Sequence, residues 1–230
     1  MLNSIVGRNR LISPLNETEK KIIRSATKLF LQNGFSRTTL KMISADCGML
    51  QGTIAYHFHT KEDMLYMLIQ ELLDFHQDVI NSSKNESKNN LIAYALEIAA
   101  QISLCENDEK AKDLYYHMYI LPGTFELVKD WTAQKNYNLL GDRLPDWTPR
   151  DFRLRENVAS MIEFSAIISP CGVFTLEEKI ALILDSLFKL YEIEKEERKQ
   201  VIEYILKLDY KNIGKNMFEQ FINRLDTSNS

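Results

Sequence analysis

The sequence predicts an all-α protein, and three observations support this. The chain of 230 residues contains only eight glycines and five prolines, the residues that interrupt helices. Its apolar side chains recur every three or four positions, which is the period of one face of an α-helix. Neither the alternation typical of a β-strand nor an internal repeat is found in the sequence. A chain of this length suits one or two domains and can bury a substantial core.

The first helix is predicted to begin after Asn16, because Asn16 and Glu19 have the spacing of a capping box. Asn33 and Gly34 end it, since glycine adopts the left-handed backbone conformation beyond a helix C-terminus without a steric penalty. Phe35 is expected to fold back onto the apolar stripe of this helix. That stripe consists of Ile22, Ile23, Ala26, Leu29 and Phe30.

Residues 1–15, before this helix, are polar and aperiodic, and they are expected to form a flexible arm. Arg8 and Arg10 could reach a DNA minor groove from such an arm. A plain disordered tail is the preferred interpretation.

The rest of the chain is predicted to be a series of helices. A long one runs from about Lys61 to Ser82, with Thr60 as its N-cap and Asp63 at its third position. A loop rich in Ser, Asn and Lys follows at 81–90. Further helices are predicted at about 88–105, 109–120, 124–140, 149–169, 175–192, 195–209 and 211–225. Breaks are expected at Pro122-Gly123, Gly141, Pro145, Pro149 and 170–172.

Charge is distributed unevenly along the chain. The formal net charge of −4 argues, taken alone, against nucleic-acid binding. Residues 1–66, however, hold nine Lys or Arg against five Asp or Glu, a net charge of +4, whereas the remainder has a net charge of −8. A basic head on an acidic body is expected when only the head meets phosphate.

The cysteines and the apolar runs predict the environment of the protein. Cys47, Cys105 and Cys171 show no CxxC spacing, so we expect a reducing, cytoplasmic environment and read Cys47 as a small buried residue. No apolar run approaches ~20 residues, the length that crosses a membrane as a helix, so we expect no membrane partner. The sequence has no Ser/His/Asp grouping, glycine-rich phosphate loop or metal-ligand spacing. We therefore expect neither an enzyme nor a cofactor or metal. His76 and His117 are the side chains that could coordinate a metal or haem, but two isolated histidines are weak evidence for such a site.

The most informative segment is residues 38–63, TTLKMISADCGMLQGTIAYHFHTKED. It predicts a helix, a tight turn at Gly48, a second short helix and a newly capped third helix. This is the pattern of a helix-turn-helix, whose second helix lies in the DNA major groove. The first of these helices begins at Thr38 or Thr39, where free N–H groups and the helix dipole favour a phosphate.

The short second helix is predicted to read base edges. Ile54 and Phe58 would hold it to the core, which leaves its N-terminal side exposed. Gln can pair with adenine, and the methyl groups of Thr and Ala suit the thymine methyl. The predicted base contacts are Gln51, Gly52, Thr53 and Ala55. The predicted phosphate contacts, which set register rather than sequence choice, are Thr38, Thr39, Tyr56, His57 and Lys61.

This segment resembles the DNA-binding region of TetR-family transcriptional regulators, whose pattern is roughly TT-x-x-x-I-A-x-x-x-G-V-S-x-G-x-L-Y-x-H/Y-F-x-S/T-K-E-x-L. The resemblance covers about residues 17–66. Leu50 departs from it, because the family usually has a serine N-cap there, and Ala55 stands where tyrosine is common. The matching residues are Asn33, Gly34, Phe35, Thr38, Thr39, Ile43, Gly48, Gly52, Thr53, Ile54, Tyr56, His57, Phe58, Thr60, Lys61, Glu62 and Met64.

The resemblance implies the domain organisation and the function. A helix-turn-helix domain at 16–62 is followed by a helical ligand-binding and dimerisation domain at 63–230. A homodimer would bind a double-stranded DNA operator and act as a repressor that an unknown small organic ligand releases. The alternatives are an activator, a ligand-independent regulator, or a helical small-molecule-binding protein that has lost specific DNA recognition.

Two further sets of residues are assigned roles with the help of the resemblance. Stripes at 149–169 and 175–192 are expected to form the dimer interface, with an ordinary intrachain core as the alternative. They contain Val158, Met161, Ile162, Ser165, Ile168, Ile180, Ile183, Leu184, Leu187 and Leu190. Aromatic residues are expected to line the ligand pocket, with core packing again the alternative; they are Tyr115, Tyr116, Tyr119, Trp131, Tyr137 and Phe164.

Overall fold

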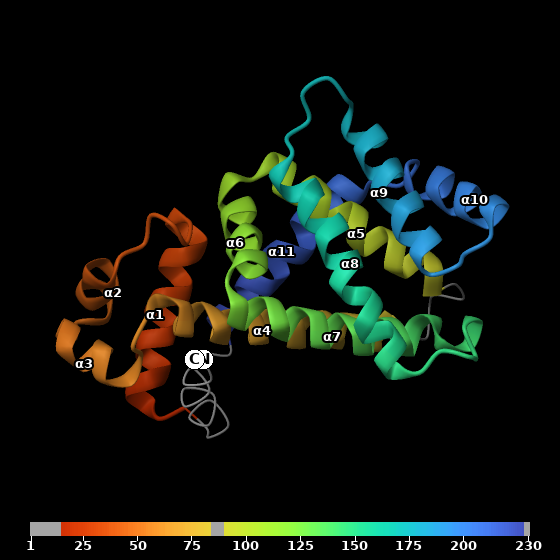
Figure 1. Cartoon of the computed structure of the whole chain (residues 1–230). Helices are drawn as coiled ribbons and strands as arrows, with labels where there is room; N and C mark the ends of the chain where they lie inside the picture. Colours follow the sequence, from red (N-terminus) through yellow and green to blue (C-terminus); the bar gives the residue numbers. More distant parts are fainter. Residues whose placement is uncertain (1–14, 84–89, 228–230) are drawn as a thin grey trace.

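A computed structural model describes residues 15–83 and 90–227, and Figure 1 shows its arrangement. Across these two ranges the chain forms α-helices and one short 3-10 helix, η2 (Gly141–Arg143), with no strand. The all-α prediction is confirmed. The predicted arm with Arg8 and Arg10 lies outside the described residues. The helices are α1 (Glu17–Asn33), α2 (Leu40–Cys47), α3 (Gln51–His57), α4 (Lys61–Ser83), α5 (Asn90–Asn107), α6 (Glu109–Ile120), α7 (Pro122–Leu140), α8 (Pro149–Ile168), α9 (Leu176–Leu190), α10 (Lys195–Ile205) and α11 (Tyr210–Thr227).

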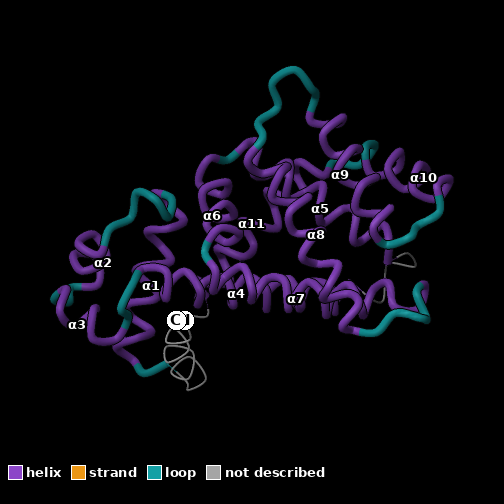
Figure 2. Tube along the Cα trace, viewed as in Figure 1, coloured by secondary structure: helices purple, strands orange, loops and turns teal. Residues whose placement is uncertain are grey.

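The three N-terminal helices form a head at one end of the molecule, and α5 to α11 form a larger body (Figure 1). The long helix α4 leads from the head into the body, where it lies beside α7. Figure 2 shows that short loops join most successive helices. None of the described helices combines the length and the apolar composition that crossing a membrane would require.

Local signals in the sequence explain most helix ends. Asn16 and Glu19 form the predicted capping box, because each side chain accepts a hydrogen bond from the backbone N–H of the other at 3.0 Å. Thr60 and Asp63 form the same reciprocal pair at the start of α4. Proline is compatible with a first helical turn, since its missing N–H would have no partner there. The predicted break at Pro122-Gly123 is therefore wrong in position: α7 begins at Pro122 and the break is Leu121.

Gly34 ends α1 differently from the prediction. Its φ of 87° is positive, but its ψ of 155° is extended, so it does not adopt the left-handed helical conformation. Only glycine occupies this region of backbone space readily. A Cβ at this position would also come within 2.9 Å of the Asp113 carboxylate. Glycine is required here both for backbone conformation and for the close approach of α6.

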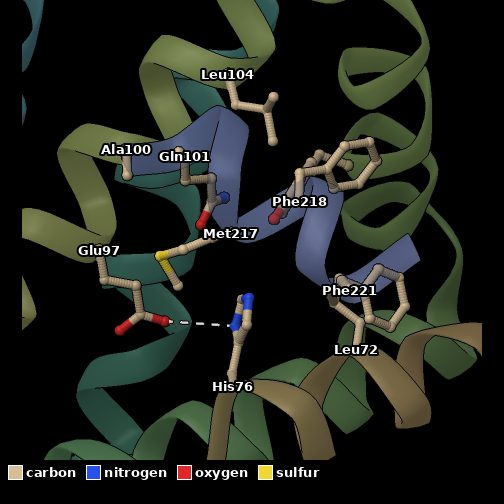
Figure 3. Close-up of a pocket in the computed structure, with 11 residues that line it drawn as sticks. Leu72, His76, Glu97, Ala100, Gln101, Leu104, Met217, Phe218 and Phe221 are labelled. Atoms are coloured by element: carbon tan, nitrogen blue, oxygen red, sulfur yellow. Dashed lines mark ion pairs between the residues drawn. The ribbon is translucent and has the colours of Figure 1, made fainter. Parts of the chain in front are cut away.

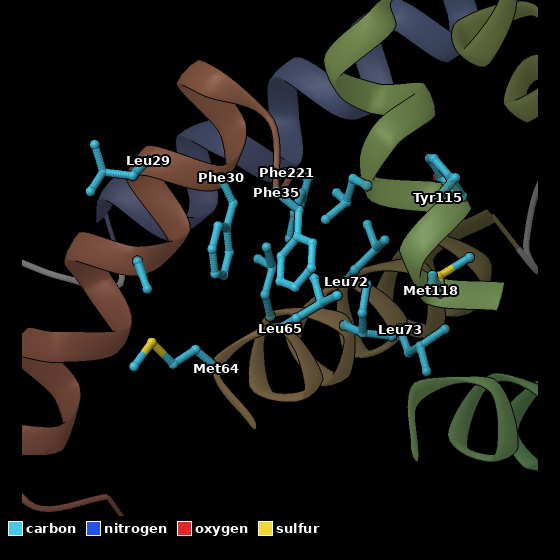
Figure 4. Packing of buried hydrophobic residues seen from close by; sticks show 14 of the residues in the cluster. Leu29, Phe30, Phe35, Met64, Leu65, Leu72, Leu73, Tyr115, Met118 and Phe221 are labelled. Carbon is cyan, nitrogen blue, oxygen red and sulfur yellow. The ribbon is translucent and has the colours of Figure 1, made fainter. Parts of the chain in front are cut away.

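The buried side chains form two clusters. The first joins the head to the body: Phe30 and Phe35, whose ring centroids are 5.1 Å apart, belong to the same cluster as Leu65 of α4 and Met118 of α6. Figure 4 shows these side chains between the helices. The second cluster lies within the body, among α5 and α7 to α11. Since the first core continues across the expected boundary at residue 62, the head is packed firmly against α4 and α6.

Candidate nucleic-acid interface and internal cavities

The helix-turn-helix is built as its sequence predicts. The helix α2 begins at Leu40, and Thr39 is its N-cap, where its hydroxyl accepts a hydrogen bond from the Met42 N–H at 3.2 Å. Gly48 makes the turn with a φ of 66° and a ψ of 28°, which is left-handed. The N-cap of α3 is Leu50, whose side chain makes no capping hydrogen bond and is 80% exposed.

The four predicted base contacts are exposed residues of α3. Ile54 is fully buried and Phe58 is 4% exposed, so both hold the helix to the head. Gln51, Gly52, Thr53 and Ala55 are all exposed. A Cβ added to Gly52 would meet no atom within 4 Å, so packing inside this chain does not demand glycine at that position. Base contact by these four residues stays a prediction.

The five predicted phosphate contacts differ in their surroundings. Thr39 and Tyr56 are exposed at the surface of the head. Thr38 is buried, and its hydroxyl donates towards the carbonyl oxygens of Leu29 and Gly34, so it is engaged inside the head. The remaining two predicted contacts also have partners within the chain.

His57 and Lys61 brace the head. His57 Nδ1 lies 3.2 Å from Glu19 Oε1. Lys61 Nζ donates to the carbonyl oxygens of Phe35 and Thr38, at 2.9 and 3.2 Å, and lies 4.1 Å from the centroid of the Phe35 ring. An ammonium has three donors, so Lys61 retains capacity for a phosphate while it ties α4 to the loop before α2.

Several basic side chains of the head are exposed. They are Lys21 and Arg24 of α1, Arg37 of the loop that follows, and Lys41 of α2. Lys28 forms an ion pair with Asp46 of α2, and this contact, together with a hydrogen bond from Ser25, lowers the pKa of Asp46. The pair therefore joins α1 to α2 as well as contributing charge.

The head contacts the body through α6. The Asp113 carboxylate accepts hydrogen bonds from the Ser36 N–H, at 2.8 Å, and from the Ser36 hydroxyl. One turn further along α6, the His117 ring packs against Phe35 with centroids 4.6 Å apart. The position of α6 and the position of the head are thus linked by direct contacts.

Two small cavities lie beside α6, each with a volume of about 30 Å³. The first is lined by α4, α5, α6 and α11, and Figure 3 shows His76, Glu97 and Met217 around it. The second is lined by α4 to α8. Leu72, His76, Glu97, Gln101 and Tyr115 contribute to both.

The predicted pocket aromatics divide into two groups. Tyr115, Tyr119 and Trp131 line the second cavity. Tyr116, Tyr137 and Phe164 are not among the lining residues: Phe164 stacks on Tyr119 with centroids 5.6 Å apart, while Tyr137 packs on Phe152. Tyr116 is 38% exposed and contacts Phe164.

Sequence analysis missed the polar groups of the second cavity, which are Glu97, Gln101, Thr132, Lys135 and Glu163. Lys135 Nζ and Glu97 Oε2 form an ion pair at 2.6 Å. Burial would raise the pKa of Glu97, but the positive charge of Lys135 and the contact with His76 hold it below its usual value. Burial lowers the pKa of His76, whose Nδ1 is 3.7 Å from Glu97 Oε1, so His76 is neutral at neutral pH.

Two further acids are buried on α8, seven residues apart. Glu163 accepts a hydrogen bond from the Tyr119 hydroxyl through Oε2 at 2.7 Å. Glu156 accepts from the Tyr191 hydroxyl at 3.3 Å and from Asn136 at 3.5 Å. Burial raises the pKa of both carboxyls, and their mutual repulsion adds to the shift of Glu156. A glutamate on the buried stripe of a predicted helix is the signal that would have revealed them.

The described residues contain no group of three or more His, Cys, Asp and Glu side chains arranged to hold a metal. His117 Nδ1 instead lies 2.8 Å from the Asp113 carbonyl oxygen. Cys47 is buried, as expected for a small core residue.

The predicted dimer residues are also divided by burial. On α8, Val158 and Met161 are 51% and 44% exposed, Ser165 is exposed and Ile162 is half-buried. On α9, the predicted residues are packed inside the chain in the second cluster, which is the intrachain alternative; they are Ile180, Ile183, Leu184 and Leu187. Ile168 of α8, also on the predicted stripe, is 46% exposed. Leu154 of α8 and Leu182 of α9, which the prediction did not include, are 65% and 66% exposed.

The head is the part of the chain that is similar in sequence to known proteins. Residues 22–66 match the family described as bacterial regulatory proteins, tetR family. The chain is 33% identical over 75 residues to the uncharacterized HTH-type transcriptional regulator YerO of Bacillus subtilis, which is 33% of this chain and 24% of that protein. It is 32% identical over 72 residues to the HTH-type transcriptional regulator TtgR of Pseudomonas putida, 31% of this chain and 34% of that protein. The matches thus span only about a quarter to a third of these relatives.

Solved structures resemble the whole fold. The crystal structure of RolR without ligand has a TM-score of 0.59 at 13% identity, and the match covers 80% of this chain and 95% of that one. The multidrug binding protein EbrR, complexed with imidazole, has a TM-score of 0.50 at 19% identity over 79% and 93% of the two chains. At these identities the likeness concerns the fold alone.

Proposed function

We propose that this chain, whose residues 22–66 match the tetR family of bacterial regulatory proteins, is a sequence-specific DNA-binding transcriptional regulator. We further propose that it acts as a homodimeric repressor and leaves its operator when a small organic ligand binds the body. The observation that carries the proposal is the exposure of Gln51, Gly52, Thr53 and Ala55 on α3, within the matched segment.

In this proposal α3 enters the major groove. The side chains of Gln51 and Thr53, and the methyl group of Ala55, contact base edges and select the sequence. Thr39, Tyr56, His57 and Lys61 contact the backbone and set the position of α3 on the duplex. The exposed basic residues of the head add a sequence-independent attraction to phosphate. Because the body is acidic, this attraction orients the head towards DNA.

The dimer would form through α8. Leu154, Val158, Met161, Ser165 and Ile168 follow one another at intervals of four and three residues, so they form one exposed stripe. Leu182 of the neighbouring helix α9 adds to it. Two such stripes related by a two-fold axis would cover each other and form a bundle of four helices. The dimer would then carry two copies of α3, as operators with two half-sites require.

The proposed ligand response follows from the position of α6. Its residues Tyr115 and Tyr119 line the cavities, and its residues Asp113 and His117 contact the head. Pockets for organic ligands typically measure roughly 300–1,000 Å³, whereas each cavity here measures about 30 Å³. A ligand must therefore favour a conformation with α6 displaced, which moves the head and weakens DNA binding by linkage.

A mobility-shift experiment with DNA flanking the gene of this protein tests the proposal. Retardation that an excess of DNA of unrelated sequence does not abolish would support sequence recognition. Loss of this retardation on addition of a small organic ligand would support the repressor mechanism. Weak retardation of every sequence alike, even at low salt, would contradict sequence recognition. A reporter gene behind the same DNA distinguishes repression from activation.

A further inference from the structure

One carboxylate oxygen of the second cavity has an unused acceptor. Glu163 is 7% exposed, lines this cavity, and binds the Tyr119 hydroxyl through Oε2 only. Its other oxygen, Oε1, is buried and has no hydrogen-bond donor among the described residues. A buried acceptor without a donor is costly, so a partner at Oε1 would be favourable.

The charged groups around the cavity leave an excess of acid. Lys135 of α7 is the cation that lines it, and Glu97 of α5 already holds this ammonium at 2.6 Å. His76 of α4 is neutral because burial lowers its pKa. Lys135 also lowers the pKa of Glu163, but burial raises it by more, so Glu163 shares this one ammonium with Glu97. Glu156 lies earlier on the same helix.

The remaining walls are aromatic and aliphatic. Trp131 and Tyr119 line the cavity together with Leu72, Leu73 and Met118. Aromatic faces attract cations as well as apolar groups, and the ammonium of Lys135 already lies 5.2 Å from the Trp131 ring centroid.

We propose that the ligand of this cavity is an apolar amine, with an aromatic or bulky hydrocarbon group, whose protonated nitrogen binds Glu163 Oε1. This inference rests on the proposed function, because it names the class of ligand for the same site. Because the cavity measures only about 30 Å³, the hydrocarbon group occupies the space that opens when α6 moves away from α7, and the charged nitrogen lies against α8. An anionic ligand fits poorly, since Lys135 is neutralised and two carboxyl groups line the cavity.

Binding of such an amine changes the protonation of Glu163. The buried carboxyl holds its proton more tightly than an exposed one, because burial raises its pKa. A neighbouring ammonium favours the ionised form, so the proton is released to solvent. Each amine bound therefore releases up to one proton.

Three probes with the same hydrocarbon group test the proposal by isothermal titration calorimetry on the full chain: phenylbutylamine, phenylbutanol and phenylbutyrate. We expect the amine to bind about tenfold more tightly than the alcohol, and the carboxylate to bind most weakly. Titration in buffers of different ionisation enthalpy should show proton release with the amine alone. Equal affinity for all three probes, tighter binding of phenylbutyrate, or no binding of any probe would overturn the proposal.

Glu163→Gln is the decisive variant, since glutamine retains an acceptor for Tyr119 but cannot ionise. It should remove both the preference for the amine over phenylbutanol and the proton release. Glu156→Gln is the matched control, because Glu156 is equally buried on α8 but does not line the cavity. This control should retain the preference; loss of the preference in both variants alike would contradict the specific role of Glu163.

Mobility shifts with the same proteins separate this inference from the proposed function. Amine binding without release of DNA would leave the ligand class standing and contradict the repressor mechanism. Absence of specific DNA binding in wild-type protein would contradict the proposed function without affecting the calorimetric result.

Discussion

Asp113 on α6 accepts hydrogen bonds from both the backbone N–H and the hydroxyl of Ser36 in the head. One carboxylate thus joins the DNA-facing part of the molecule to the helix that lines both cavities. Gly34 permits this approach, since any Cβ there would come within 2.9 Å of the carboxylate. The helix that lines the cavities and the head are thus connected by a direct contact rather than by a long chain of interactions.

We expect Asp113→Ala to loosen the head. Losing hydrogen bonds to a charged group costs about 1.5–3 kcal/mol, and DNA affinity should fall several-fold because the orientation of the two heads is less fixed. Mobility shifts and thermal unfolding measure the two effects. Asp108→Ala is the matched control: Asp108 caps α6, accepting from the Lys110 and Ala111 N–H groups, without touching the head. An equal loss of DNA affinity in both variants would show that α6 stability alone matters.

We expect Gly52→Ala to separate stability from DNA binding. Alanine favours a helix over glycine by about 1 kcal/mol, and the added Cβ meets no atom of the chain within 4 Å. The free energy of unfolding should rise slightly, whereas DNA affinity should fall about tenfold if this surface lies against bases. Gly172→Ala, at another open glycine far from α3 in the sequence, should leave DNA affinity unchanged. Full DNA binding by Gly52→Ala would contradict the orientation proposed for α3.

Gln51 and Lys61 should differ in the kind of DNA binding that they support. Gln51→Ala should change preference at one base pair, at a cost of about 1–3 kcal/mol. Lys61→Met keeps the hydrocarbon packing on Phe35 but removes the charge, so it should weaken binding to every sequence about equally and reduce the salt dependence. Titration of operator variants at several salt concentrations distinguishes the two. Identical, sequence-independent losses would contradict base reading by Gln51.

Glu156 should make stability depend on pH. Because burial raises its folded-state pKa, the folded protein keeps a proton that the unfolded chain releases above the ordinary pKa near 4.5. Stability therefore falls as pH rises from that value towards the raised folded-state pKa. Glu156→Gln removes this loss and should be more stable than wild type at alkaline pH, by about 1 kcal/mol or more, but not at acidic pH. Denaturant titrations at several pH values measure the free energy of unfolding of both proteins, and Glu203→Gln, at an exposed position, is the control. A stability difference between Glu156→Gln and wild type that does not vary with pH would contradict the role of the raised Glu156 pKa.

Val158→Glu should prevent dimerisation. The substitution places a charge in the exposed apolar stripe of α8, where a partner chain would have to desolvate it. Sedimentation should then report a monomer with an unchanged helical spectrum. Tyr204→Glu, at a half-exposed tyrosine of α10, should leave the oligomeric state as it is. A dimer that survives Val158→Glu would exclude this face as the interface.

Helices and their ends could be predicted because their signals are local. The Asn16–Glu19 and Thr60–Asp63 pairs lie within one turn and act wherever the chain folds. The helix-turn-helix could also be predicted, because the spacing of Gly48, Ile54 and Phe58 specifies its turn and its packing.

Tertiary features were harder to predict. The stripe of α9 was correctly apolar, but an amphipathic pattern cannot distinguish a partner chain from the same chain, and Ile180 and Leu184 face the intrachain core. The cavities depend on which helices meet, so Tyr115 and Tyr137 looked equivalent in sequence although only Tyr115 lines a cavity. Glu163 could have been suspected, because an acid on a buried stripe conflicts with its surroundings.

The two small cavities share a wall that includes Tyr115. A smaller side chain at this position would enlarge both cavities on the side of α6. Asp113 and α3 would keep their own side chains. Under the proposed function, substitution at position 115 would therefore change which compounds the body accepts and leave the DNA-contacting residues as they are, so the two specificities can vary separately.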